Sequence, residues 1–280
     1  MSILKMGGES IHKQNLKLEK NIKVSLIIAI YKKKEFIEAV LESINYQTYR
    51  NFEVIVAEDD NTLGEFINSL RKKLNYKLIH VQQEDKGFRK NKILNKGIKI
   101  SKGELIIFID QDCMIHPKFL EEYVKNFKKG DMFTGRRFNL GKKYTELVLK
   151  NRTRKFNLLK LLFTDSPIKK FPDAIYFPWV DLKRNTRCLG SNYGIKRKLL
   201  LELNGLNEDY TGYGNEDVDI EKRVLMAGGK LFSMKNKAIQ YHLYHPEPQG
   251  SLERWNLNKE ILEKTIGTKQ YICRNGLEKL

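Results

Sequence analysis

Short apolar segments alternate with helix-patterned segments through the first 130 residues. Four segments are rich in aliphatic and β-branched side chains, and they span residues 23–31, 52–57, 76–81 and 103–109. Apolar residues then recur at helical spacing, for example at Phe36, Ile37, Val40, Leu41 and Ile44. This alternation predicts an α/β fold, in which helices cover a sheet.

Three further helices are expected between and after these strands. One carries apolar residues from Leu63 to Leu74 on one face, and one spans residues 90–100. Another follows Pro117, a residue type favoured in the first turn of a helix, and has apolar residues from Phe119 to Phe127.

The chain is 280 residues long, which suffices for one large domain or two fused halves with a sizeable core. Its three cysteines are an odd number without close pairing, which favours a reducing compartment over a disulfide framework. The longest apolar runs are far shorter than the roughly 20 residues of a membrane-spanning helix. The N-terminus lacks a signal-peptide core. We therefore expect a cytoplasmic protein, in the cytosol or at the inner face of the membrane.

Basic residues outnumber acidic residues by 52 to 34, and the formal net charge is +18. This excess predicts attraction to an anionic partner, such as nucleic acid, a lipid headgroup or a phosphorylated substrate. Residues 142–160 contain seven basic residues and only one acidic residue, Glu146. An anionic partner is expected to contact this segment.

Acidic residues follow two of the predicted strands. Glu58, Asp59 and Asp60 end the second strand, and Asp110 and Asp112 end the fourth. Ligands of open α/β sheets bind beyond the carboxyl ends of the strands. In extended backbone, residues i and i+2 point the same way, so Asp110 and Asp112 can converge on one cation. The pair predicts a site for Mg²⁺ or Mn²⁺ that holds substrate phosphates. The alternative is a solvated loop that caps the next helix.

Four stretches of the sequence resemble a known enzyme family. Residues 24–60 (VSLIIAIYKKKEFIEAVLESINYQTYRNFEVIVAEDD) and 87–120 (GFRKNKILNKGIKISKGELIIFIDQDCMIHPKFL) are similar to the nucleotide-sugar-binding half of family 2 glycosyltransferases with the A-type fold. Residues 190–231 and 241–247 (YHLYHPE) resemble the acceptor-side module of bacterial chondroitin-polymerase-type enzymes and animal β-1,4-galactosyltransferases. Together the stretches lie within roughly residues 23–248.

The resemblance implies an A-type glycosyltransferase fold, a Rossmann-like mixed sheet flanked by helices with a smaller acceptor-side lobe. It implies a nucleotide-sugar-binding subdomain at 23–130 and an acceptor-binding, catalytic subdomain at 131–250. Residues 1–22 would form an N-terminal extension. Residues 251–280 would form a C-terminal appendage that is helical at its start.

The resemblance also implies roles for residues on the donor side. Asp59 matches the carboxylate that contacts uracil, Asp110 would lie near the ribose, and Asp112 would bind the metal that bridges the diphosphate. Arg89 or Lys90 is the expected basic residue of the donor loop. This chain departs from the family's common Asp-Asp-Gly-Ser, because it reads Glu-Asp-Asp-Asn at residues 58–61.

Residues 212–219, GYGNEDVD, resemble the acceptor-binding pattern Gly-Trp-Gly-Gly-Glu-Asp-Asp of the galactosyltransferases. By this resemblance Asp217 is the catalytic base, Glu216 orients the acceptor sugar, and Asp219 is the next candidate base. Inverting sugar transfer requires a carboxylate to take the proton of the attacking hydroxyl. The alternative is an acidic first turn that complements the helix dipole.

Two histidines lie in the YHLYHPE stretch. The resemblance implies that one completes the metal site, with His242 matching the Tyr-His context and His245 as the second candidate. Imidazole among carboxylate and phosphate oxygens favours Mn²⁺ over Mg²⁺. The alternative is that both are ordinary surface or structural histidines.

Three residues are expected near the donor-sugar and acceptor pocket because the family lines it with this region: Trp179, Arg187 and Asn192. Trp179 would stack on a sugar face, or else belong to the core.

Residues 138–185 match no family pattern. The run Leu158 to Phe163 is apolar and flanked by basic residues, which is typical of an amphipathic helix on an anionic membrane surface. A helix packed within the acceptor lobe is the alternative.

These observations predict an inverting, metal-dependent glycosyltransferase. It would move a hexose or N-acetylhexosamine from a UDP-sugar to a bacterial surface glycan, such as a lipopolysaccharide, a capsule or a lipid-linked glycan. The alternatives are a GDP- or dTDP-sugar donor, or a basic nucleic-acid-binding module. The nucleic-acid hypothesis leaves the acidic strand ends unexplained, so we expect no nucleic acid among the partners.

Overall fold

The computed structural model describes residues 22–156, 158–183, 188–246 and 251–280. Its strands are β1 (Val24–Ile30), β2 (Phe52–Glu58), β3 (Lys77–Gln82), β4 (Leu105–Asp110), β5 (Cys113–Ile115), β6 (Met132–Thr134), β7 (Phe138–Asn139), β8 (Asn192–Lys196), β9 (Leu231–Ser233) and β10 (Gln240–His242). Its α-helices are α2 (Lys34–Ile44), α3 (Gly64–Leu70), α4 (Lys90–Ile100), α5 (Phe119–Lys125), α6 (Lys142–Lys150), α7 (Leu158–Leu162), α8 (Arg197–Glu202), α9 (Glu216–Met226) and α10 (Leu252–Thr268). Short 3₁₀ helices are η1 (Arg71–Lys73), η2 (Phe127–Lys129) and η3 (Ile168–Ala174).

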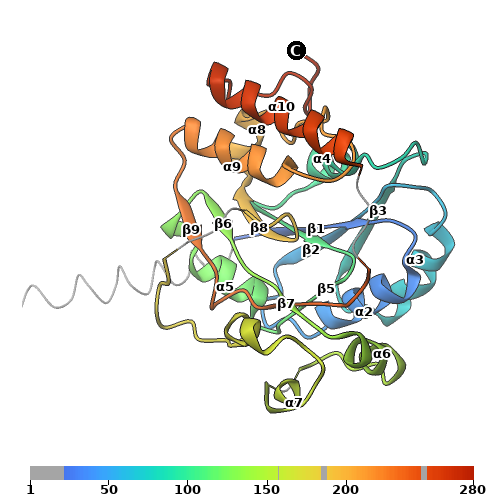
Figure 1. Ribbon diagram of the computed structural model, residues 1–280. Coiled ribbons are helices and arrows are strands. Elements are labelled where there is room, and N and C mark those ends of the chain that lie inside the picture. Colours follow the sequence, from blue (N-terminus) through green and yellow to red (C-terminus); the bar gives the residue numbers. More distant parts are fainter. Residues whose placement is uncertain (1–21, 157, 184–187, 247–250) are drawn as a thin grey trace, which may run out of the picture.

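A seven-stranded mixed sheet forms the centre of the molecule, in the order β3-β2-β1-β4-β8-β6-β9 (Figure 1). The strands β3, β2, β1 and β4 are parallel, whereas β8 is antiparallel to both β4 and β6. These first four strands and the helices between them lie where the sequence predicts them. The α/β class and the A-type fold are therefore confirmed.

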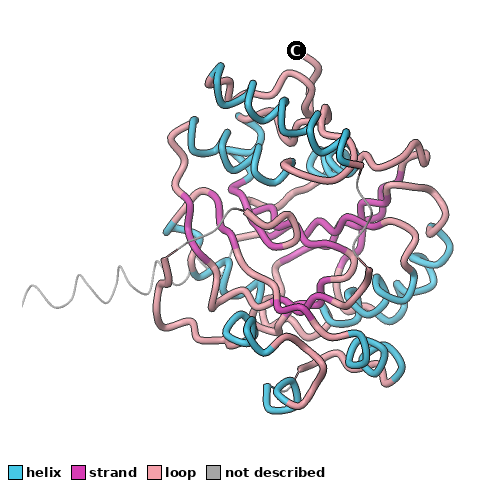
Figure 2. Tube along the Cα trace, viewed as in Figure 1, coloured by secondary structure: helices cyan, strands magenta, loops and turns pink. Residues whose placement is uncertain are grey.

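Alternating side chains of the central strands pack on the two faces of the sheet. In β1, Leu26 and Ile28 belong to one buried cluster with α2, α3 and α5, and Ile27 belongs to another with α4, α8 and α9. Figure 2 shows the strands enclosed between these two layers of helices. Because both faces are covered, the parallel strands read as nearly continuous apolar runs.

The helix predicted over residues 63–74 is shorter than expected. Its α-helical part ends at Leu70, and the 3₁₀ helix η1 continues to Lys73. The predicted C-terminal helix is present as α10, which contacts α9 (Figure 1). Among the residues that the structure describes, no helix combines the length and apolar character that a membrane crossing requires.

A second, three-stranded sheet has the order β5-β10-β7. Its strand β5 begins three residues after β4 ends, and it pairs antiparallel with β10 so that Cys113 faces His242. This pairing brings the end of the fourth strand to a segment 130 residues later in the chain.

The two predicted subdomains share the central sheet. Strands β6, β8 and β9 come from residues 131–250, and β8 is hydrogen-bonded directly to β4. The division into a nucleotide-sugar-binding subdomain and an acceptor-binding subdomain at residue 130 therefore stays a prediction about function.

Candidate active site

Asp112, His242 and His245 form a cluster in which one ligand atom from each lies within 4.8 Å of the others. The β5–β10 pairing positions them, and the backbone N–H of Leu243 donates to the carbonyl of Asp112 at 2.8 Å. His245 Nε2 lies 3.0 Å from Asp112 Oδ2, and His242 Nε2 lies 3.5 Å from Asp112 Oδ1. One carboxylate and two imidazoles are a donor set that fits Mn²⁺ and similar divalent ions.

The pKa values of these three side chains bear on how the cluster would bind a cation. Burial raises the pKa of Asp112, but the hydrogen bond from His245 and the neighbouring His242 outweigh it and lower the pKa to about 2. Burial lowers the pKa of His242 to about 4, so its imidazole is neutral near pH 7. The hydrogen bond to Asp112 raises the pKa of His245 above its usual value. A metal ion would therefore displace a proton mainly from His245.

A second cluster centres on Lys90, the first residue of α4. Its Nζ donates to Asp110 Oδ1 at 2.6 Å. Burial lowers the pKa of Lys90, but the charges of Asp110, Glu216 and Asp217 raise it further than burial lowers it. Lys90 thus pairs with the end of β4, and its charge acts on the first turn of α9.

The three carboxylates around Lys90 have raised pKa values. For each of Asp110, Glu216 and Asp217, burial is the main cause. Asp217 Oδ2 accepts the N–H of Gly190 at 2.9 Å, and its Oδ1 accepts the N–H of Val218 at 2.8 Å. These bonds fix the orientation of the carboxylate, and the raised pKa makes it a stronger base.

Asp59 lies directly after β2 and is buried. Its Oδ1 accepts a hydrogen bond from Gln83 Nε2 at 2.6 Å, and its Oδ2 accepts one from the backbone N–H of Arg89 at 2.7 Å. Burial raises its pKa. The side chain of Arg89 turns to the carbonyl of Glu84 in its own loop. The interaction of Arg89 with Asp59 in this structure is therefore through the backbone.

The Glu-Asp-Asp-Asn sequence at residues 58–61 has a structural explanation. Glu58 is fully buried, and its Oε1 accepts the N–H groups of Thr62 at 2.8 Å and Leu63 at 2.7 Å. Its Oε2 lies 2.6 Å from His80 Nε2. Asp60 is also fully buried and accepts a hydrogen bond from the Thr62 hydroxyl at 3.0 Å. Both side chains are used to build the turn before α3, whereas the side chain of Asp59 accepts hydrogen bonds from Gln83 and Arg89 of the donor-side loop.

Asp219 does not join the clusters. Its carboxylate is buried and bonds Arg223 Nε at 2.7 Å within α9. Arg223 is fully buried and donates to the carbonyls of Leu203 and Gly205 at 3.0 Å each. The pair holds the turn after α8 against α9, so Asp219 is a structural residue here.

The side chains of two predicted pocket residues have described contacts outside the clusters. Asn192 is fully buried, and its amide bonds the carbonyls of Arg136 and Ala238 and the hydroxyl of Tyr123. The side chain of Trp179 is 77% exposed and packs edge-on against Phe177. Arg187 lies outside the described residues.

Sequence reasoning missed Arg137, which follows β6. Its positive charge favours the deprotonated forms of His242, His245 and Asp110, and opposes the net rise in the pKa of His245, so the guanidinium lies near both clusters. The available signal was the basic pair Arg136-Arg137, which follows β6 after one glycine.

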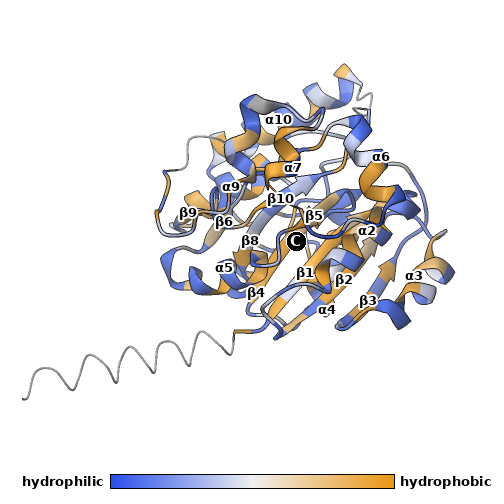
Figure 3. Cartoon of the chain, turned by 90° about the horizontal axis from the view of Figure 1, so that it is seen from below, coloured by the Kyte–Doolittle hydropathy of each residue, from blue (hydrophilic) through white to orange (hydrophobic). Residues whose placement is uncertain are grey.

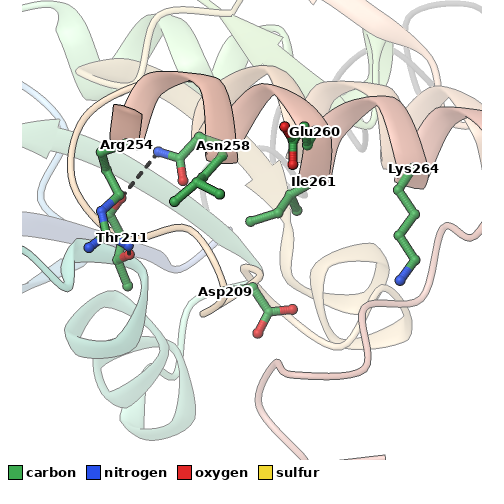
Figure 4. A pocket seen from close by; sticks show the side chains of 8 residues that line it. Asp209, Thr211, Arg254, Asn258, Glu260, Ile261 and Lys264 are labelled. Atoms are coloured by element: carbon green, nitrogen blue, oxygen red, sulfur yellow. Dashed lines mark hydrogen bonds between the residues drawn. The ribbon is translucent and has the colours of Figure 1, made fainter. Parts of the chain in front are cut away.

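An open groove of about 330 Å³ lies between α10 and the loop before α9 (Figure 4). It is lined by Asp209, Thr211, Arg254, Leu257, Asn258, Glu260, Ile261 and Lys264. The groove contains none of the predicted site residues. One residue of its wall nevertheless holds the loop that leads into α9. Asn258 is almost fully buried and donates to the carbonyls of Thr211 at 3.2 Å and Tyr213 at 3.5 Å.

Two models of protein families match the chain. The model of glycosyl transferase family 2 matches residues 25–180, and the model described as the N-terminal domain of galactosyltransferase matches residues 180–246. The chondroitin synthase of Escherichia coli is 22% identical over 265 residues, which are 87% of this chain and 38% of that protein. The chain spans about a third of the length of the curated relatives that it matches.

Solved structures show the same fold. Staphylococcus aureus TarS 1–349 in complex with UDP aligns with a TM-score of 0.60 and 18% identity, covering 89% of this chain and 65% of that one. GalNAc-T7 with UDP, GalNAc and Mn²⁺ aligns with a TM-score of 0.63 and 14% identity, covering 87% and 48%.

Proposed function

Because the chain belongs to glycosyl transferase family 2, we propose that it transfers a hexose or N-acetylhexosamine from a UDP-sugar to a bacterial surface glycan, with inversion. A fold neighbour was solved with UDP, and a relative is named chondroitin synthase, which support the donor and the class of acceptor. The observation that carries the proposal is the placement of a possible metal cluster and a carboxylate–lysine cluster at the two ends of the Asp110-Gln111-Asp112 segment.

On the donor side, Asp59 is proposed to receive the uracil, and Asp110 the ribose. Asp59 directly follows β2 and Asp110 is the last residue of β4. These parallel strands flank β1, so both residues lie at the same edge of the sheet. This edge is where open α/β sheets bind nucleotides. The Gln83 and Arg89 contacts hold Asp59 in place, and Lys90 holds Asp110.

Asp112 and His242 are proposed to bind a divalent cation, with His245 as a third ligand. Their donor set fits Mn²⁺, and a fold neighbour was solved with that ion. When bound, the ion would neutralise the diphosphate of the donor. The neutral imidazole of His242 and the ionised carboxylate of Asp112 are the forms that bind metal.

Asp217 is proposed to act as the general base. It would take the proton of the acceptor hydroxyl as that oxygen forms a bond to the anomeric carbon, while the bond from the same carbon to UDP breaks. Glu216, beside it in the first turn of α9, would orient the acceptor sugar. Lys90 would keep both carboxylates ionised through its positive charge.

The test is an assay of nucleotide release. The protein is incubated with Mn²⁺, a panel of UDP-, GDP- and dTDP-sugars, and glycan acceptors of bacterial surface polysaccharides. We expect acceptor-dependent UDP release from at least one UDP-sugar. Release from only GDP- or dTDP-sugars would reassign the donor, and the absence of release from every donor would refute the proposal.

A further inference from the structure

The short helix α7 presents apolar side chains to solvent. Its inner side, Leu158 and Leu161, packs against the core. On its outer side Leu162 is 41% exposed, and the next residue, Phe163, is 90% exposed. Leu159, on the same outer side, is 68% exposed. We call Leu159, Leu162 and Phe163 the α7 patch. Large exposed apolar side chains gathered at helical spacing mark an interaction surface.

The α7 patch is held rigidly against α6. Helix α6 begins after Gly141, which has no side chain to cap it, and Asp165 supplies the cap from the end of the α7 segment. Its two carboxylate oxygens accept the N–H groups of Lys143 at 2.8 Å and Tyr144 at 3.0 Å. Ser166 Oγ accepts the N–H of Gly141 at 3.0 Å. The exposed apolar residues therefore belong to a fixed structure.

Lysines are frequent in the segment that carries the α7 patch. Residues 142–170 contain nine basic residues and two acidic ones, Glu146 and Asp165. Arg152 and Arg154 pair with Glu38 and Glu42 of α2. The seven lysines are all exposed to solvent, and they are Lys142, Lys143, Lys150, Lys155, Lys160, Lys169 and Lys170. Figure 1 shows α6 and α7 together on one side of the molecule, the side opposite α10, and Figure 3 views the molecule from below, toward the side of α6 and α7.

This side adjoins the candidate metal ligands. Thr145 Oγ1 of α6 accepts the backbone N–H of Tyr244 at 2.9 Å, between His242 and His245. A surface bound to the α7 patch would therefore lie beside the site.

From these observations we propose that the α7 patch and its lysines bind the surface of an anionic lipid bilayer. Phe163 and Leu162 would enter the boundary between headgroups and acyl chains, and the lysines would contact anionic headgroups. A second copy of the chain fits the patch poorly, because a symmetric contact would bring two sets of seven lysines together. Nucleic acid would satisfy the lysines, and a base would stack on Phe163, but it offers no apolar partner for Leu159 and Leu162.

The test is co-sedimentation of the full chain with vesicles. One set contains phosphatidylcholine alone, and the other contains phosphatidylcholine with phosphatidylglycerol. We expect binding to the anionic vesicles only, weakening as salt is added. Phe163→Ser should weaken partitioning about tenfold or more, because the apolar area of the side chain no longer enters the bilayer. Lys160→Gln should weaken it about fivefold.

Leu252→Ser is the matched control. Leu252 is 74% exposed on α10, at the far side of the molecule, and its loss should leave vesicle binding unchanged. Equal binding to neutral and anionic vesicles, no binding, or full binding by Phe163→Ser would overturn the proposal. So would light scattering that shows a dimer which Phe163→Ser dissociates. Nucleotide release without vesicles should be unchanged in Phe163→Ser, so this proposal can fail while the proposed function stands.

Discussion

Asp217 is the residue whose exchange best separates chemistry from binding. Asp217→Asn keeps the shape of the side chain and removes its capacity to accept a proton. We expect turnover to fall by about 10²–10⁴-fold, the usual contribution of general-base catalysis. The affinity for UDP and metal, measured by calorimetry, should stay nearly unchanged. Near-normal turnover at saturating acceptor would contradict the role of Asp217.

Glu216→Gln is the contrasting variant at the neighbouring position. An orienting carboxylate acts by placing the attacking hydroxyl, so its loss should appear mainly in the KM of the acceptor or in kcat/KM. Initial rates over a range of acceptor concentrations distinguish the two patterns. Equal effects of both variants on kcat alone would contradict the division of roles.

Removal of the metal, or of one ligand, is a second prediction at the residue scale. Excess chelator should abolish most of the binding of UDP, because the diphosphate then meets Asp110 and Asp112 without a neutralising cation. Asp112→Ala should lose the same metal-dependent part of the affinity. His80→Ala serves as a control, because His80 is a histidine that pairs with Glu58 outside the cluster. UDP binding that is unchanged by chelator would refute the metal site.

The residues of the metal cluster illustrate what a sequence can indicate. Asp112 follows a recognisable strand, and His242 lies in a recognisable motif, so a resemblance suffices to pair them. The proximity of His245 depends on the chain beyond β10, whose path no local pattern determines. For Asn192 the sequence indicates a position in the motif but not the contacts of the side chain. Its amide hydrogen-bonds to Tyr123, Arg136 and Ala238.

At the scale of elements, α10 supports the loop that leads into α9. Gly212 and Gly214 both have positive φ, at 73° and 116°, and a Cβ at Gly214 would lie 2.9 Å from Trp255 Cδ1. The N–H of Gly212 also donates to the carbonyl of Phe88, in the donor-side loop, at 3.1 Å. The loop is therefore held between α10 and the segment that carries Arg89 and Lys90.

Gly214→Ala should destabilise the protein by about 1–3 kcal/mol, because the left-handed backbone and the contact with Trp255 are both unfavourable for a side chain. Gly267→Ala is the matched control on α10. No atom lies within 4 Å of the added Cβ there, and alanine is favoured in a helix, so we expect stabilisation by up to about 1 kcal/mol. Urea denaturation measures both. Equal stability of the two variants would contradict the supporting role of α10.

The four long strands of the first half follow directly from their patterns, whereas the short strands of the second half do not. Strands β1, β2 and β4 are continuous apolar runs that need no partner to be recognised. Strands β6, β7, β9 and β10 have two or three residues each, too few for any periodicity. They are strands because a neighbouring edge supplies hydrogen bonds, which is a property of the whole fold.

For the whole molecule, acid should reduce stability in part through His116. This side chain is largely buried and stacks on Tyr176, with ring centroids 4.8 Å apart, and its Nδ1 accepts the N–H of Lys118. Burial lowers its pKa to about 4, whereas an unfolded histidine titrates near 6.5. As the pH falls, His116 therefore binds a proton at a higher pH in the unfolded chain than in the folded protein. The contribution of His116 to the free energy of unfolding is complete above about pH 6.5 and is lost toward pH 4. About 2 kcal/mol of it is lost by pH 5.

His116→Asn tests this titration. The amide oxygen of asparagine takes the place of Nδ1 as an acceptor but binds no proton. The variant is expected to be less stable at pH 8, because it lacks the stacking on Tyr176, yet to lose less stability between pH 7 and pH 5. Urea denaturation across this range gives the two slopes, and parallel slopes would contradict the prediction.

The place of β8 in the central sheet limits how this chain can be recombined with its relatives. It aligns with β4 at five positions, from Leu105 opposite Lys196 to Ile109 opposite Asn192. A chimera that joins the donor half of one parent to the acceptor half of another would inherit the two sides of this pairing from different sequences. Exchange of donor specificity between family members should therefore keep β4, β6 and β8 from a single parent and replace only the loops at the carboxyl edge of β1 to β3.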